Sequence, residues 1–226
     1  MLMLYLIGIV FALIGMGVQY RLKSKIAKYS EMTLLNRMSG REIAEKMLKE
    51  NGIFDVKIIS VTGQLTDHYN PTNKTVNLSH DVYHGRNAAA AAIAAHECGH
   101  AVQHNVAYPL LGFRSTIVPV VNIANTIMPW VLMGGIFLLS RVPGLLLIAI
   151  IAQAAITLFT LVTLPVEFDA SRRALNWLTS SGMVVSHEYD AARDALKWAA
   201  MTYVVATLAA VAQLLYLISR YSGRRD

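Results

Sequence analysis

The 226-residue sequence has few charged residues and one cysteine. Charged residues make up 15% of the chain and hydrophobic residues 55%, whereas about a quarter of an average soluble protein is charged. This balance excludes an ordinary soluble protein and indicates a membrane protein. The single cysteine, Cys98, excludes an intramolecular disulfide. The net charge of +6 is not gathered into one basic run with interleaved aromatic residues, which argues against a nucleic-acid partner.

Four stretches are apolar and long enough to cross a bilayer core of about 30 Å as helices. They are residues 1–20, 116–139, 143–164 and 199–219. None has a charged residue in its interior, which argues against an ion transporter. The first stretch has no basic leader and no small-residue cleavage site, so we expect an uncleaved anchor rather than a signal peptide.

Basic residues follow the first stretch immediately, in the run Arg21-Leu22-Lys23-Ser24-Lys25. By the positive-inside rule, residues 21–115 and 165–198 are expected in the cytoplasm, with residues 116–164 forming a transmembrane hairpin. Only Ser140-Arg141-Val142 would then be exposed outside, at the tip of that hairpin. The basic tail, residues 220–226, opposes this orientation because its arginines would also be external.

The soluble part, residues 21–115, contains signals for a small mixed α and β fold. Ser39-Gly40-Arg41-Glu42 is a capping box, and the helix it begins should stop at Asn51-Gly52. Residues 54–61 are rich in Val and Ile and predict a strand, and residues 63–78 predict a hairpin with its turn at 70–73. A small sheet is therefore expected beside the next helix. Its edge strand either holds an extended peptide or only covers that helix.

The sequence His96-Glu97-Cys98-Gly99-His100 follows Asn87, a good N-cap residue, and a run of alanines, so it is expected on a helix. Residues four apart lie on one side of a helix, so both imidazoles can bind one metal ion. Glu97 projects elsewhere and can take a proton from zinc-bound water, while Cys98 points away from the metal. The spacing predicts one zinc ion per chain and metal-assisted hydrolysis, most often of a peptide bond.

A catalytic zinc ion normally has three protein ligands, so one more is needed. Glu167 can be this third ligand, because a transmembrane hairpin returns it to the side of the membrane on which the two histidines lie. His104 lies about 12 Å beyond His96 along the helix, too far for the same metal, and is expected to contact a ligand or lie at the surface. His187 and Glu188 are on the same side, but an acidic first turn of a new helix explains them through capping.

Asp169 precedes Arg172 and Arg173 by three and four residues. That spacing predicts ion pairs within a helix. A contact with a zinc-binding histidine is the alternative, and both remain open. Arg173, His104 and Tyr203 are candidates for stabilising the oxyanion of a hydrolytic reaction.

Several runs together resemble the YugP-like neutral zinc metallopeptidases of prokaryotic membranes. These runs are residues 65–71, Leu78-Ser79, residues 82–86, residues 94–104, residues 164–171 and Thr202-Tyr203-Val204. The chain departs from the pattern at Asn70, where Asp is expected, and at Asn87, where Ser is expected.

The resemblance implies a gluzincin arrangement in which a downstream glutamate is the third ligand, and in this chain that residue is Glu167. Related membrane proteases place an aspartate four residues after the glutamate, where this chain has Ser171. Asp169, Ser171 and His104 are therefore the candidates for contacting a zinc ligand without binding the metal.

The sequence thus predicts a mainly α membrane protein with about four transmembrane helices and a small α+β, zincin-like cytoplasmic part. Its expected function is that of a membrane-integral zinc metalloendopeptidase, with Glu97 as general base and His96, His100 and Glu167 as ligands. Its substrates would be membrane-associated proteins or peptides, cleaved at the cytoplasmic face of the prokaryotic inner membrane. The alternative is a catalytically inactive, zinc-binding membrane scaffold.

Overall fold

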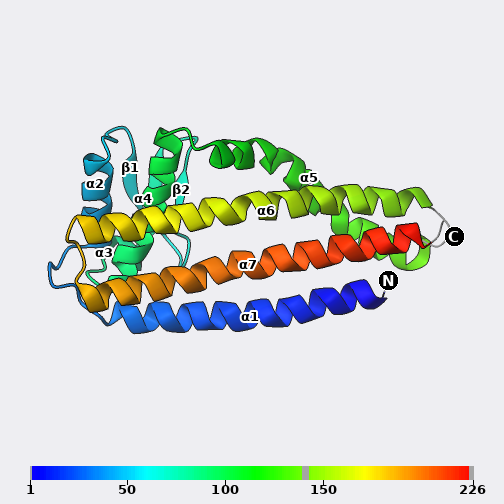
Figure 1. Cartoon of the computed structure of the whole chain (residues 1–226), viewed down its shortest axis with the longest axis horizontal. Coiled ribbons are helices and arrows are strands. Elements are labelled where there is room, and N and C mark those ends of the chain that lie inside the picture. The colour runs from blue at the N-terminus through cyan, green and yellow to red at the C-terminus, as the bar shows by residue number, and fades with distance from the viewer. Residues whose placement is uncertain (1, 139–142, 224–226) are drawn as a thin grey trace. The chain divides into compact units, whose positions relative to one another are not determined.

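The computed structural model describes residues 2–138 and 143–223 and is mostly helical (Figure 1). Its elements, in chain order, are α1 (Leu2–Ser30), α2 (Gly40–Glu50), β1 (Lys57–Val61), β2 (His68–Asn70), β3 (Thr75–Ser79), α3 (His80–His84), α4 (Ala88–Asn105), α5 (Pro109–Leu138), α6 (Pro143–Ser180) and α7 (Ser186–Ser222). The chain divides into two compact units, each built from separate parts of the sequence.

Four helices are long and apolar enough to cross a membrane. These are Leu2–Ser30, Pro109–Val131, Gly144–Ser180 and Ser186–Ser222. The expected mainly α fold with four such helices and a small sheet is confirmed. The first, third and fourth of these helices continue well beyond their apolar stretches into segments that carry charged residues. The expected hairpin tip at 140–142 and the tail arginines Arg224 and Arg225 lie outside the described residues.

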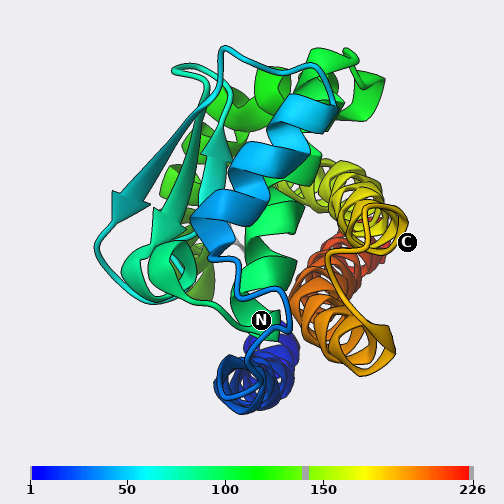
Figure 2. The same cartoon turned by 90° about the vertical axis from the view of Figure 1, so that its left-hand side faces the viewer.

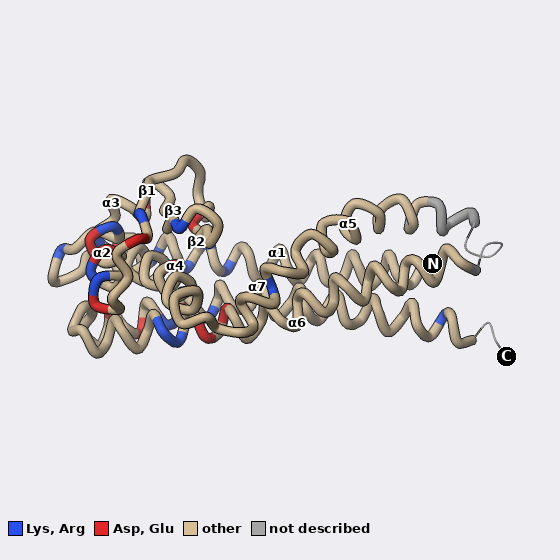
Figure 3. The backbone as a smooth tube through the Cα atoms, turned by 90° about the horizontal axis from the view of Figure 1, so that it is seen from above, with Lys and Arg blue, Asp and Glu red and all other residues tan. Residues whose placement is uncertain are grey.

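The apolar unit consists of Met1–Val18, Gly112–Pro165 and Met201–Asp226. Among its described residues the charged ones are Arg114 and Arg220, and Figure 3 shows how few coloured segments interrupt these helices. Gln153 donates a hydrogen bond to the carbonyl of Ala210 at 3.1 Å, and this bond joins α6 to α7. A neutral polar side chain between apolar helices is thus used for helix association.

The sheet-bearing unit consists of Gln19–Leu111 and Val166–Ala200. Its helix α2 begins at the expected capping box: Ser39 accepts from the Glu42 N–H, and Glu42 accepts from the Ser39 N–H. The helix ends at Glu50 with Asn51 as its C-cap, and Gly52 then adopts a φ of +70° that favours glycine. Its buried face, Ile43, Ala44, Met47 and Leu48, packs against α4.

The sheet has the strand order β1-β3-β2, with β1 parallel and β2 antiparallel to β3. The expected hairpin is present, since β2 and β3 are joined by a short turn. The strand expected from residue 54 begins instead at Lys57, because Lys57 is opposite Thr75, the first residue of β3. Figure 2 shows α2 and α4 side by side, with the strands beside them.

Helix α4 lies at the centre of this unit and carries the histidine pair. The Asn87 side chain accepts from the N–H of Ala90, which confirms the expected N-cap. Its small residues allow close packing: a Cβ added to Gly99 would lie 2.6 Å from the carbonyl oxygen of Ala170 on α6. The backbone of α6 therefore passes directly against the middle of the helix that bears the histidines.

Candidate metal centre

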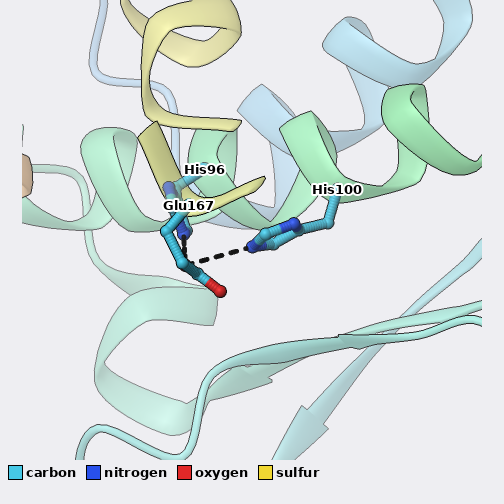
Figure 4. A group of neighbouring side chains, drawn as sticks. All are labelled: His96, His100 and Glu167. Carbon is cyan, nitrogen blue, oxygen red and sulfur yellow. Dashed lines mark ion pairs between the residues drawn. The ribbon is translucent and has the colours of Figure 1, made fainter. Parts of the chain in front are cut away.

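His96, His100 and Glu167 form a group whose ligand atoms all lie within 4.8 Å of one another (Figure 4). The Glu167 Oε2 atom is 3.3 Å from the Nε2 atom of His96 and 3.5 Å from that of His100. The two histidines come from successive turns of α4, and the glutamate comes from α6. The side chains of His96, His100 and Glu167 are 13%, 9% and 3% exposed. The group is thus nearly closed to solvent, and His96 is its most exposed member.

The second nitrogen of each imidazole has its own partner. The Nδ1 atom of His96 lies 3.1 Å from the Ser171 hydroxyl, and the Nδ1 atom of His100 lies 3.0 Å from the Gln103 Oε1 atom. An amide oxygen only accepts hydrogen bonds, so the Nδ1 atom of His100 must be the protonated donor. This tautomer leaves the Nε2 lone pair directed toward Glu167, as metal binding requires.

Gln103 is fully buried and links the two helices that supply the ligands. Its amide nitrogen donates to the Val166 carbonyl at 2.8 Å and to the Asp169 carboxylate at 2.9 Å. These two bonds set the orientation of the amide, so that its oxygen faces His100. A hydrogen-bonded chain therefore runs from His100 through Gln103 to Asp169, two residues after Glu167 on α6.

Of the two kinds of contact left open for Asp169, the structure has the ion pairs within the helix. It forms ion pairs with Arg172 and, at 2.5 Å, with Arg173. It also accepts from Gln103, so it reaches His100 through one intermediary rather than directly. The two arginines balance the charge of this nearly buried carboxylate, which then holds the Gln103 amide in place.

Glu97 is buried beside the three-residue group and its Oε2 atom accepts a hydrogen bond from the Tyr69 N–H at 2.9 Å. Tyr69 lies in β2, at the edge of the sheet. Burial raises the pKa of the Glu97 carboxyl, and the neighbouring His96 and His100 oppose that effect. The carboxylate is thus held next to the ligand group by the backbone of the edge strand.

The remaining candidates lie away from the three ligand atoms. The His104 ring nitrogen contacts the Tyr69 hydroxyl at 2.7 Å, and its side chain is exposed. Glu188 accepts from the N–H groups of Leu35 and Val185, both at 2.8 Å, so it caps its own helix and secures a second segment. Cys98 lies against the carbonyl of Ala44 on α2, and burial raises the pKa of its thiol.

Among the oxyanion candidates, Arg173 is engaged with Asp169 and lies over the Tyr108 ring. His104 is engaged with Tyr69. Tyr203 belongs to the apolar unit. The ion pair of Arg173 is the one that its spacing from Asp169 predicts, whereas the sequence did not indicate the contact of His104 with Tyr69.

The donor set fits zinc. Tetrahedral zinc with ligands at about 2.0–2.1 Å separates neighbouring ligand atoms by about 3.3–3.4 Å. The two observed separations from Glu167 are 3.3 and 3.5 Å. Burial lowers the pKa of His100, but the hydrogen bond to Glu167 and its charge outweigh burial and raise the pKa. The negative charge of Glu167 therefore favours a cation between the three side chains, and a zinc ion would supply that charge while His100 stays neutral. Two imidazoles and one carboxylate leave the fourth position open.

Sequence reasoning overlooked Gln103 and the Tyr69 backbone. Gln103 follows His100 by three residues, and this helical spacing places the two side chains on one face. That spacing was a usable signal. The Tyr69 N–H carried no signal in the sequence, because its contact with Glu97 depends on where the edge strand lies.

Comparison with known proteins matches residues 4–222 to the family described as "putative neutral zinc metallopeptidase". The chain is also 40% identical, over 208 residues, to a curated protein of Bacillus subtilis (strain 168) described as "Putative membrane protease YugP". The alignment covers 92% of each chain. No solved structure matches.

Proposed function

This chain belongs to the neutral zinc metallopeptidase family, and from that premise we propose that it is a membrane-integral zinc metalloendopeptidase. One zinc ion would be held by His96, His100 and Glu167. The observation that carries the proposal is the convergence of these three ligand atoms within 4.8 Å, from helices that are far apart in the sequence. The resulting arrangement is that of a gluzincin, with Glu97 next to the ligands and not among them.

When bound, zinc supplies a Lewis acid that polarises the scissile carbonyl and lowers the pKa of a water molecule to about 7. Glu97 is the general base: it takes a proton from the attacking water and afterwards gives it to the leaving amine. Its hydrogen bond from Tyr69 fixes the carboxylate in the orientation needed for both transfers. Ser171 and Gln103 hold the imidazoles, which keeps their Nε2 atoms directed to the metal.

The edge strand β2 supports a peptide as the substrate. Its Tyr69 N–H already reaches Glu97, so the edge of β2 that faces away from β3 runs past the general base. An extended peptide added to that edge would bring its own backbone to the same place. Of the two roles expected for the sheet, holding a peptide is therefore the one we propose.

We place residues 21–115 and 165–198 on the cytoplasmic side of a prokaryotic inner membrane. They form a zincin-like part that contains α4, the helix with His96 and His100. Residues 1–20, 116–164 and 199–219 would form the transmembrane anchor, hairpin and final helix. Cys98, the single cysteine, is fully buried, so a cysteine placed at the exposed Lys49 reports accessibility without background. An impermeant maleimide should label Lys49→Cys in inverted vesicles and not in intact cells; labelling in intact cells would reverse the orientation.

The activity is tested with protein purified in detergent. Wild type should contain one zinc ion per chain and cleave an unfolded substrate such as casein. Glu97→Gln should retain zinc and lose cleavage, because it removes the base and leaves the ligands. Stoichiometric zinc with no Glu97-dependent cleavage across many substrates would instead support the zinc-binding scaffold.

A further inference from the structure

Helix α4, which carries His96 and His100, is accessible to solvent along one narrow strip of its surface. Within residues 88–103, all of which the structure describes, every residue is buried except Ile93 and His96. These two lie three residues apart, on the same side of α4 and about 4.5 Å apart along its axis. Whatever reaches the ligand His96 along this helix therefore passes Ile93.

Ile93 opens into a cavity of about 380 Å³ within the sheet-bearing unit. The cavity is lined by the second half of α1, the loop before β2, the helix α3 and the first turns of α4. Its apolar lining consists of Ile26, Ala27, Leu65, Val82, Ala89, Ala90 and Ile93. The alanines and Ile93 lie on successive turns, so the cavity continues the same strip of α4 away from His96.

The polar groups of this cavity do not require a charged occupant. Asp67 accepts from the Ser79 N–H at 2.7 Å and from the Ser79 hydroxyl at 3.2 Å, so its carboxylate is already used to join β3 to the preceding loop. Lys23 and Asp81 are exposed at the rim and have opposite charges. Ser30 donates to the Ile26 carbonyl, Asn87 accepts from the Ala90 N–H, and Gln64 is exposed. The rest of the lining is aliphatic, and the cavity has a size within the range of ligand-binding cavities.

We propose that this cavity receives a large apolar side chain of the substrate, close to the scissile bond, and so sets the cleavage specificity. The inference rests on the proposed peptidase activity. The strip from Ala89 to His96 covers about 10 Å of helix axis. An extended peptide advances about 3.3 Å per residue, so the occupant belongs to a residue within about three positions of the bond that is cut.

Ile93→Phe and Ile93→Ala test the assignment, with Ile58→Ala as a matched control. Ile58 is also a partly buried isoleucine packed on the same core, and it does not line the cavity. The substrates are capped peptides that differ at one position, occupied by Ala, Leu, Phe or Trp. Relative kcat/KM values are measured with zinc-loaded full-length protein, and binding of the same peptides is measured by calorimetry with the Glu97→Gln background.

Wild type should prefer Leu or Phe to Ala by at least about tenfold, as a well-matched apolar pocket does. Ile93→Phe should reverse this preference, Ile93→Ala should shift it toward Trp, and Ile58→Ala should leave it unchanged. Cleavage with the same preference in all variants would overturn the cavity assignment while leaving the peptidase intact. If wild type binds the peptides but does not cleave them, the proposed peptidase activity is rejected. In that case, peptide binding whose selectivity depends on Ile93 would still support the cavity assignment, and binding that does not depend on Ile93 would reject it too.

Discussion

Replacing Gln103 by alanine removes the contact that orients His100 without removing any of the three proposed zinc ligands. The side chain is fully buried and makes three hydrogen bonds, to His100, to the Val166 carbonyl and to Asp169. After truncation the His100 Nδ1–H has no fixed acceptor, so the ring can rotate or change tautomer. Gln103 is thus a positioning residue, and its loss should be visible in metal binding.

The magnitude follows from these contacts. Loss of a partner that orients a metal-binding histidine typically lowers metal affinity by about 10- to 100-fold, which corresponds to about 1.4–2.7 kcal/mol. Asp169 keeps its two arginine partners. The main structural cost is therefore that the His100 Nδ1–H and the Val166 carbonyl each lose one hydrogen bond. We expect the free energy of unfolding to fall by about 1–3 kcal/mol as well.

The assay is zinc competition against a chromophoric chelator, at a temperature where both proteins are folded by circular dichroism. Gln153→Ala is the matched control, because Gln153 is also a buried glutamine that donates to a carbonyl, that of Ala210. It should lower stability without changing zinc affinity. Zinc affinity within twofold of wild type for folded Gln103→Ala would refute the proposed role of Gln103.

Three further predictions separate metal binding, helix packing and capping. Glu167→Ala should lose zinc, while Glu188→Ala should keep it and lose about 1 kcal/mol of stability with its cap; metal analysis showing the reverse would reject the ligand set. Gly99→Ala should lower the unfolding temperature in detergent, since its Cβ would lie 2.6 Å from the backbone of α6, and an unchanged temperature would contradict that close approach. Ser39→Ala should cost about 1 kcal/mol in urea unfolding. Hydrogen bonds from Ser39 hold the pKa of Glu42 below its ordinary 4.5, so they stabilise the folded protein above that pH. The difference in unfolding free energy between wild type and Ser39→Ala should therefore shrink as acid protonates Glu42. A difference that stays constant with pH would contradict this role of the Ser39 hydroxyl.

The sequence by itself determined the features that depend on neighbouring residues. The spacing of His96 and His100 on a helix capped by Asn87 follows from local hydrogen bonding and helix periodicity. The capping box at Ser39 is equally local. The four membrane-length helices follow from composition, because a bilayer core demands long apolar stretches whatever their tertiary contacts.

Tertiary structure decided which distant residues meet around the motif. Ser171 lies 75 positions from His96, and Asp169 lies 66 positions from Gln103, yet each pair is in hydrogen-bond contact. No periodicity encodes such contacts, since they depend on how closely α6 approaches α4 at Gly99. The same reason applies to Tyr69, whose backbone reaches Glu97 only once the sheet is assembled. The local sequence pattern thus predicted the helix that carries His96 and His100. Packing between segments far apart in the chain supplied the groups that orient its side chains.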